Sequence, residues 1–139
     1  MRRKIRCPVA ATLDLVGDRW TLLIIRDLLR GHHRFSELQR TVEGIPASVL
    51  SERLKVLERE GIVTRRLYSE HPPRAEYVLT PKGHGLGVVV GALASWGERY
   101  AEHDLSLVDK ECGHGVAVTY HCPTCDRLAP RKNVRIVPA

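Results

Sequence analysis

The chain has 139 residues, of which 43% are hydrophobic and 27% are charged, and its formal net charge at pH 7 is +6. This composition is typical of a folded domain and excludes a disordered chain. No window approaches the ~18–20 consecutive apolar residues of a membrane span, and no apolar signal-peptide core follows the basic start. We therefore expect a cytoplasmic protein without a membrane partner. A positive net charge favours a polyanionic partner such as DNA.

Apolar residues at helical spacing predict a series of helices in the first half of the chain. Asp18 is a suitable N-cap for the second of them, and Gly61 ends the last. A short turn containing Gly44 joins the last two, which is the pattern of a helix-turn-helix motif whose second helix can enter a DNA major groove. The predicted helices cover residues 8–16, 20–29, 35–42 and 47–60.

Two strand-like runs follow, over residues 62–68 and 76–80, with a turn over 70–74 that contains two prolines. A hairpin directly after the second helix of a helix-turn-helix motif is the wing of a winged helix domain. Several basic side chains on this hairpin could contact phosphate or the minor groove. Each of them alone is equally compatible with a solvated surface charge, and their clustering favours the DNA contact. They are Arg65, Arg66, His71 and Arg74.

A long helix is expected next, with Thr80 as its N-cap, Pro81 as its first residue and an end near Tyr100. It carries an apolar stripe, which either covers the core of the domain or forms a seam with a second copy of the chain. Four glycines lower its helix propensity, so the helix needs packing to hold it. The stripe consists of Leu86, Val90, Leu93, Gly97 and Tyr100.

About two thirds of the chain, in unbroken order, resembles the HxlR-type winged helix regulators, relatives of the broader MarR group. The resemblance implies a homodimer built from the N-terminal helix and the helix around Leu86–Tyr100. It also implies a near-palindromic operator and bacterial transcriptional control, often by repression. The matching segments are CPV at 7–9, LVGDRWTLLI at 15–24, GHHRFSEL at 31–38, GIPASVLSERL at 44–54, LEREGIV at 57–63 and PPRAEYVLT at 72–80.

The expected fold is mainly α with a small β wing (α+β). We expect a winged helix-turn-helix DNA-binding and dimerisation domain over residues 1–103, followed by a small zinc-ribbon-like extension over residues 104–139. In such a domain the N-terminal residues of the helix over 47–60 reach base edges, and its first amides suit a phosphate. The predicted DNA-contacting residues are Ser36, Ala47, Ser48, Ser51, Glu52, Arg53, Lys55, Arg65, Arg66 and Arg74.

These side chains have different expected partners. Ser48, Ser51 and Lys55 can donate to guanine or to phosphate, and Glu52 can accept from cytosine N4. Ser36 precedes them on the helix over 35–42 and can touch the DNA backbone. For Arg53 a phosphate contact and an intramolecular salt bridge both stay open, because this residue lies between the core face and the groove face.

Cys7 is a cysteine just before the first helix. It could be a small buried apolar group or a thiol that senses oxidants. Neighbouring cations favour the thiolate form of a cysteine, and Arg6 is adjacent. The family resemblance implies a redox-sensing thiol here in some members. An unidentified small-molecule or oxidant effector therefore belongs to the predicted partners.

The remaining cysteines lie near the end of the chain and predict a metal site. A C-x-H pair, a strand-like run over 116–120 and a C-x-x-C pair resemble a small zinc ribbon, in which four N or S ligands bind Zn²⁺ tetrahedrally. The zinc would be structural, since so short a segment lacks a core. His121 or water is an alternative fourth ligand, and free reduced thiols are the alternative without metal. The expected ligands are Cys112, His114, Cys122 and Cys125.

Other function classes fit the sequence less well. The C-x-x-C pair resembles a glutaredoxin motif, but that motif opens a helix after the first strand of its fold. A zinc deaminase needs an H-x-E motif, which the chain lacks. A protein-interaction module has no need of a basic wing, and RNA binding through aromatic stacking is disfavoured by the single phenylalanine. The leading hypothesis is a sequence-specific regulator that binds double-stranded DNA, expected to repress, and not an enzyme.

Overall fold

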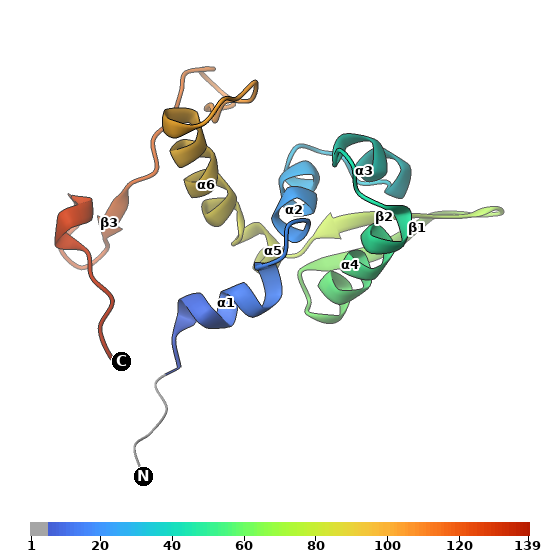
Figure 1. The fold of residues 1–139 in the computed structure, drawn as a ribbon, viewed down its shortest axis with the longest axis horizontal. Helices are drawn as coiled ribbons and strands as arrows, with labels where there is room; N and C mark the ends of the chain where they lie inside the picture. Colours follow the sequence, from blue (N-terminus) through green and yellow to red (C-terminus); the bar gives the residue numbers. More distant parts are fainter. Residues whose placement is uncertain (1–5) are drawn as a thin grey trace, which may run out of the picture. The chain divides into compact units, whose positions relative to one another are not determined.

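The computed structural model describes residues 6–139, which form two compact units over Arg6–Val90 and Gly91–Ala139. Figure 1 shows the elements in chain order. Helix α6 (Gly87–Tyr100) crosses the boundary between the units. The rest of the first unit contains α1 (Pro8–Val16), α2 (Thr21–Leu29), α3 (Phe35–Thr41), α4 (Ala47–Arg59), β1 (Val63–Glu70), β2 (Pro73–Leu79) and α5 (Pro81–His84). The rest of the second contains β3 (Tyr120–Cys122), β4 (Arg127–Ala129) and a 3₁₀ turn over Arg131–Asn133.

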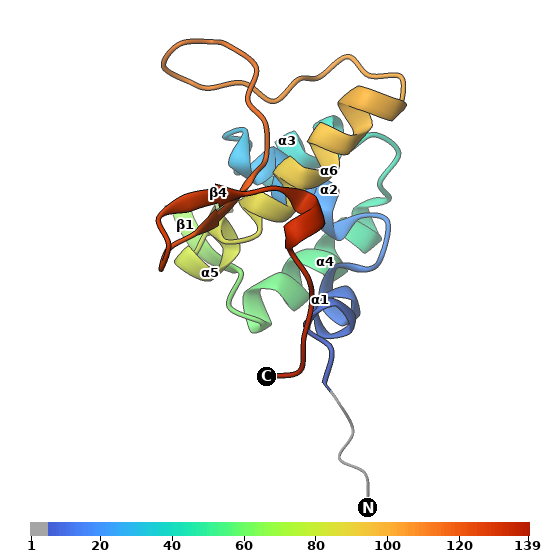
Figure 2. The same cartoon turned by 90° about the vertical axis from the view of Figure 1, so that its left-hand side faces the viewer.

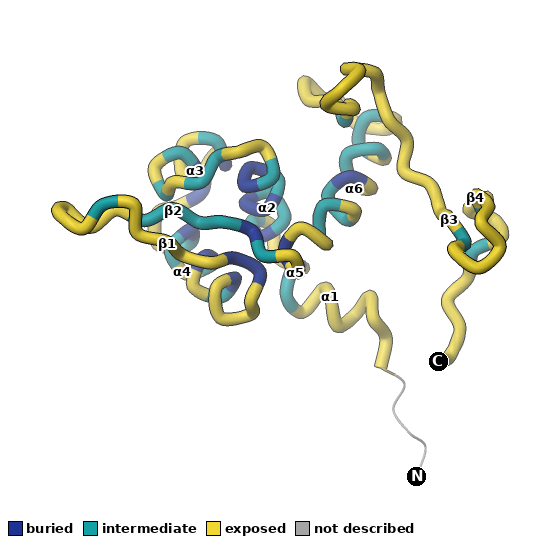
Figure 3. The backbone as a smooth tube through the Cα atoms, turned by 180° about the vertical axis from the view of Figure 1, so that it is seen from behind, coloured by how far each residue is buried: buried dark blue, intermediate teal, exposed yellow. Residues whose placement is uncertain are grey.

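The core of the first unit lies between α2, α3, α4 and the base of the β1–β2 hairpin. Figure 3 shows buried residues, in dark blue, on these elements. Helix α4 shows why this sequence folds as it does, because Leu50, Leu54 and Leu57 recur at spacings of four and three and are at most 1% exposed. Burying each leucine contributes about 1.5–3 kcal/mol. The other buried apolar side chains are Val16, Ile24, Ile25, Leu28, Leu38, Val42, Ile45, Ile62, Val63 and Leu79.

Asp18 binds the first amides of α2 as expected of a cap, although Trp20, and not Asp18, is the residue that directly precedes the helix. The carboxylate of Asp18 accepts hydrogen bonds from the backbone N–H groups of Trp20 (2.9 Å) and Thr21 (3.0 Å). The Thr21 hydroxyl donates to the same carboxylate. These bonds satisfy amides that have no partner within the helix, so they fix where α2 begins.

The hairpin extends further than expected. Strands β1 and β2 pair antiparallel from Val63 with Leu79 to Glu70 with Pro73, and the register shifts between Leu67 and Ser69. The expected turn over 70–74 is wrong in length, because only His71 and Pro72 stand between the strands. A proline at the first position of a strand does not interrupt its pairing when its nitrogen faces away from the ladder.

The expected continuous helix over residues 81–100 is also wrong, since the chain forms the short α5 and then α6. The hydroxyl of Thr80 accepts from the amide of Gly83 and donates to the Gly61 carbonyl, so the first turn is capped as predicted. A Cβ on Gly83 would lie 2.2 Å from the Ile62 carbonyl oxygen, so only glycine permits this close approach. Further glycines at 85 and 87 lower the helix propensity where the break falls.

The second unit has little interior. Among its residues only Gly91 is buried, where Leu107 and Val118 approach it. Val108 and Gly115 form an isolated bridge, and β3 pairs with β4 in a small hairpin whose second strand is labelled in Figure 2. The strand expected over 116–120 is largely wrong, because only its last residue lies in β3. No helix in the described residues is long and apolar enough to cross a membrane.

Candidate nucleic-acid interface

Helices α3 and α4 form the expected helix-turn-helix motif. Gly44 adopts a left-handed φ of +80° in the turn, and the next residue, Ile45, is buried. The left-handed conformation suits glycine, which reverses the chain here without strain. Leu38 on α3 and Leu50 on α4 are both fully buried in the shared core. This packing fixes α4 beside α3 and leaves the opposite face of α4 to solvent.

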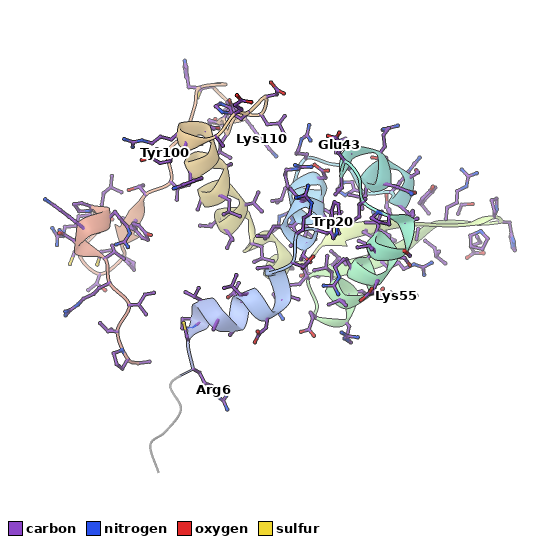
Figure 4. The ribbon with its side chains drawn as sticks, viewed as in Figure 1. Arg6, Trp20, Glu43, Lys55, Tyr100 and Lys110 are labelled. Carbon is purple, nitrogen blue, oxygen red and sulfur yellow. The ribbon has the colours of Figure 1, made fainter. Side chains whose placement is uncertain are left out.

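The exposed face of α4 carries the predicted base-reading side chains. Ser48, Glu52 and Lys55 are exposed, and Ser51 is half-buried beside them. Figure 4 labels Lys55 on this helix, which begins at Ala47. No side chain of the described residues caps the start of α4, since Pro46 precedes it. The first amides of the helix are therefore available to an anion such as a DNA phosphate.

Arg53 is engaged within the protein. Its Nη1 lies 3.6 Å from Oδ1 of Asp18, and its Nη2 lies 3.3 Å from Oε1 of Glu52. Of the two alternatives for this residue, the structure shows the intramolecular salt bridge. Partial burial raises the pKa of Asp18, but hydrogen bonds from Thr21 and Trp20 and the charge of Arg53 outweigh it. The pKa of Asp18 therefore lies below its ordinary value, and the carboxylate stays charged at neutral pH.

A buried carboxylate on α2, which the sequence did not reveal, is linked through an arginine to the end of α3. Asp27 is fully buried and pairs with Arg26 Nε at 2.9 Å and with Arg30 Nη1 at 3.2 Å. Arg26 also reaches the carbonyl of Thr41 at the end of α3, at 3.5 Å. The available signal was Arg30 three residues after Asp27, a spacing that permits an ion pair on a helix.

The wing arginines fall into two groups. Arg66 is paired with Glu76 on the neighbouring strand, with Nε–Oε1 at 2.9 Å. Arg65 and Arg74 are exposed, and they form no ion pair with any described residue. The local positive charge of the hairpin is therefore carried mainly by Arg65 and Arg74, while Glu76 offsets that of Arg66.

The segment before α3 joins the wing to the helix-turn-helix motif. The backbone N–H of Tyr77 donates to the carbonyl of His33 at 2.8 Å, and the backbones of Arg34 and Glu76 form an isolated antiparallel β-bridge. The guanidinium of Arg34 lies 4.5 Å from the ring centroid of Tyr68 on β1. Neither Arg34 nor Tyr68 was predicted as a functional residue, because their proximity depends on strand register. Ser36, which was predicted, is exposed in the first turn of α3.

The cysteines fall in separate places. Cys7 is exposed and is the N-cap residue of α1. The predicted zinc ligands do not gather, because the described residues contain no group of three or more His, Cys, Asp or Glu that could hold a metal ion. Cys112 lies in a turn, where its backbone N–H donates to Oδ1 of Asp109 at 3.2 Å. Of the four, Cys122 and Cys125 lie on one hairpin, where Cys122 ends β3 and Cys125 lies in the turn before β4.

Comparison with known proteins agrees with this architecture. Residues 15–105 match the family described as HxlR-like helix-turn-helix. The uncharacterised HTH-type transcriptional regulator Rv3095 of Mycobacterium tuberculosis is 37% identical over 130 residues, which cover 91% of this chain and 82% of the relative.

Solved structures show the same similarity. The crystal structure of PA1607 superposes with a TM-score of 0.79 at 32% identity and covers 94% of each chain. The redox regulator HypR in its oxidised form superposes with a TM-score of 0.63 at 36% identity, covering 71% of this chain and all of HypR. The winged helix fold is thereby confirmed. The family and its relatives are transcription regulators and not enzymes. The chain belongs to the HxlR-like helix-turn-helix family and is a transcription regulator with a helix-turn-helix DNA-binding domain.

Proposed function

We propose that the protein binds a specific near-palindromic operator in double-stranded DNA as a homodimer and represses transcription there, in the cytoplasm. The observation that carries this proposal is the division of α4 into two faces. Leu50, Leu54 and Leu57 anchor one face in the core, while Ser48 and Lys55 stand exposed on the other. A helix held in this way presents hydrogen-bonding side chains to base edges without disturbing its own packing.

The wing supplies the contact with the DNA backbone in this proposal. Arg65 and Arg74 lie exposed on a hairpin that directly follows α4, so both can reach phosphates beside the groove that α4 enters. Arg53 contributes indirectly, because its ion pair with Asp18 ties α4 to the start of α2. Phosphate contacts fix the register of a protein on DNA, and base contacts then select the sequence.

Dimerisation is supported by apolar side chains that the single chain leaves in water. Helix α1 exposes Val9 and Leu13, each more than half exposed. Helix α6 exposes Leu93, Trp96 and Tyr100 to a similar extent. Contiguous exposed apolar side chains mark interaction surfaces, and a second copy of the chain can cover both helices symmetrically. A two-fold dimer then accounts for an operator with two half-sites.

An oxidant is the effector that we favour, with Cys7 as the responding thiol. Cys7 is exposed at the start of α1, so an oxidant can reach it, and a change there would act on a helix of the proposed dimer seam. The similarity to the redox regulator HypR supports this assignment.

The test is selection of genomic DNA fragments by the full-length protein at near-physiological salt, followed by sequencing and footprinting. The proposal expects an inverted repeat whose half-sites lie about one helical turn, ~34–36 Å, apart. Binding without sequence preference that weakens steeply with salt would overturn the specific operator. Sedimentation of the protein alone tests the dimer independently. A reporter gene behind the operator tests repression, which requires increased transcription when the regulator is deleted.

A further inference from the structure

We propose that the segment over residues 127–135, which reads RLAPRKNVR, is a second DNA contact, whose basic side chains bind phosphates of the duplex without reading its sequence. The contact rests on the proposed binding of double-stranded DNA, but not on the operator, its symmetry or the dimer. Three properties of the segment support it: its net charge, the exposure of its basic side chains and a turn that orients one of them.

The segment is the most basic stretch in the described part of the chain. Residues 7–103, which include the helix-turn-helix motif and the wing, contain only one more basic than acidic residue. In residues 104–126 acidic residues outnumber basic ones. Residues 127–135 contain four basic residues and no acidic one, and residues 1–6 contain as many. Nine residues thus carry a larger net positive charge than the whole winged helix, and this charge attracts DNA.

The basic side chains of the segment lie in water without acidic partners. All of them are exposed, and none forms an ion pair with a described residue. The adjacent carboxylate, Asp126, lies 3.0 Å from His121 instead, measured between Oδ1 and Nε2. Like charges that crowd together repel one another, and a polyanion that neutralises them relieves this repulsion. The four side chains are those of Arg127, Arg131, Lys132 and Arg135.

Backbone hydrogen bonds give the middle of the segment a defined conformation. Strand β4 pairs with β3, and the 3₁₀ turn over Arg131–Asn133 follows it. The N–H of Asn133 donates to the carbonyl of Pro130 at 2.9 Å. The N–H of Val134 donates to the carbonyl of Arg131 at 3.1 Å, and the side chain of Val134 is half-buried. The basic side chains therefore project from an ordered backbone.

The guanidinium of Arg131 is oriented by the same turn. Its Nη1 donates to the carbonyl of Val134 at 3.0 Å. A guanidinium has several N–H donors in one rigid plane, so the remaining donors of Arg131 stay available to a phosphate, which accepts two parallel N–H bonds. Less side-chain entropy is lost on binding when the guanidinium is already held. Arg131 is therefore the central phosphate ligand of the segment, and its basic neighbours add to the attraction.

Double-stranded DNA is the polyanion that fits the segment best. The chain belongs to a helix-turn-helix family, and a DNA duplex carries one negative charge per ~1.7 Å of its axis. Residues 127–135 contain no aromatic residue, so the bases of single-stranded RNA would find no ring to stack on. An anionic membrane surface favours an amphipathic helix, whereas the segment forms a strand and a 3₁₀ turn. Contacts to phosphate add affinity without sequence preference.

The test is a salt titration of the full chain binding to random-sequence duplex DNA, followed by fluorescence anisotropy. Two variants neutralise the segment, and each should reduce the slope of log K against log salt by at least ~0.9, the value for one phosphate contact. One variant replaces all four basic residues with glutamine. The other carries only Lys132→Gln and Arg135→Gln, and it keeps the bond from Arg131 to Val134 if the fourfold variant fails to fold.

The matched control carries Lys82→Gln and Lys110→Gln, which change the net charge as much as the double variant does. Lys82 donates to the carbonyl of Glu60 at 2.7 Å, and Lys110 lies between Asp109 and Glu111, so neither belongs to an unpaired basic cluster. This control should leave the slope unchanged. Circular dichroism of each variant checks that the fold persists.

Three outcomes would overturn the proposed contact. In the first, folded variants of the segment reduce the slope by less than ~0.9. In the second, the control reduces it as much as the double variant, so that net charge and not the segment is responsible. In the third, the variants bind DNA as the wild type does but lose binding to heparin, or to vesicles of phosphatidylcholine and phosphatidylserine in equal parts, which would assign the segment to another polyanion.

Failure of the operator is a separate result. If the wild type selects no inverted repeat, but the slope on random DNA still falls in the segment variants, the proposed operator is wrong and the second contact stands. If an inverted repeat is selected and the slope does not fall, the operator stands and the second contact is wrong.

Discussion

Arg53 on α4 lies 3.6 Å from Asp18, the carboxylate that caps the start of α2, measured between Nη1 and Oδ1. The two side chains are only 23% and 31% exposed, so water screens their attraction less than that of a fully exposed pair. The carboxylate of Asp18 thus binds the first amides of α2 and also forms an ion pair with α4, the helix that we place in the major groove. Recognition and stability are coupled at this point.

Replacing Asp18 should therefore destabilise the fold. The change Asp18→Ala removes the cap of α2 and leaves Arg53 with Glu52 as its acidic neighbour. We expect a loss of about 1–2 kcal/mol in the free energy of unfolding, as for other lost caps, measured by urea denaturation. Asp14→Ala is the matched control, since Asp14 is exposed on α1. Equal losses in the two variants would show that the cap and the ion pair contribute nothing measurable.

Stability should fall at acid pH through Asp27. Burial raises the pKa of this carboxyl, but hydrogen bonds from Arg26 and Arg30 and the charge of Arg26 outweigh it, so the pKa in the folded state lies below 3.8. A depressed folded pKa gives stability that is full above the unfolded value and is lost as pH falls through the folded value. Urea midpoints should therefore drop as the pH is lowered below about 3.8.

The change Asp27→Asn should lower stability at pH 7 and make it vary less with pH in the acid range. It keeps the size of the side chain but leaves Arg26 half-buried without its carboxylate partner. Asp14→Asn serves as the control, because that side chain is exposed. An unchanged pH profile in Asp27→Asn would assign the acid transition to other carboxylates.

Replacing Arg74 should weaken DNA binding without changing the preferred sequence. Arg74 is exposed on the wing, whereas Arg66 is paired with Glu76. If Arg74 contacts one phosphate, Arg74→Ala should reduce the slope of log K against log salt by about 0.9. A salt titration of operator and random DNA measures this. Arg66→Ala should change the slope less, and the reverse order would mean that the Arg66 ion pair opens on binding.

Replacing Lys55 should instead change sequence preference. Its side chain is exposed on the groove face of α4, two turns from the helix start. The loss of a specific base contact costs about 1–3 kcal/mol of discrimination at that base pair. Repeating the fragment selection with Lys55→Ala should relax one position in each half-site, and Arg59→Ala, at the end of α4, should not. A uniform loss of affinity with the same consensus would make Lys55 a phosphate contact.

A charge placed in the apolar stripe of α6 should dissociate the proposed dimer. Trp96 is 65% exposed and its ring lies 5.1 Å from that of Tyr100, between centroids. Trp96→Lys would bury an unpaired ammonium in a dimer seam, which is costly. Sedimentation should then show monomers, and Glu102→Gln, beyond the end of α6, controls for the same change of +1 in net charge. Wild-type protein that is monomeric at micromolar concentration would exclude the dimer.

The sequence by itself determined helices α1 to α4 and the presence of the wing. Leu50, Leu54 and Leu57 recur at the period of one helix face, and Asp18 and Thr80 are caps that act within a few residues of themselves. Periodicity and capping are local, so they can be predicted from neighbouring residues. The family resemblance then indicated the order of the elements and the DNA-binding class.

Only the tertiary structure decided how distant residues pair. Arg53 forms an ion pair with Asp18, Arg66 forms one with Glu76, and Gly83 lies close to the carbonyl of Ile62. These contacts depend on packing angles and strand register, which no local pattern encodes, and they separate the engaged arginines from those left in solvent. The same holds for the tail, where spacing predicted a four-ligand metal set and the described residues bring no three such ligands together. Spacing can place ligands within one turn, but whether two turns meet depends on the packing of a segment with almost no core of its own.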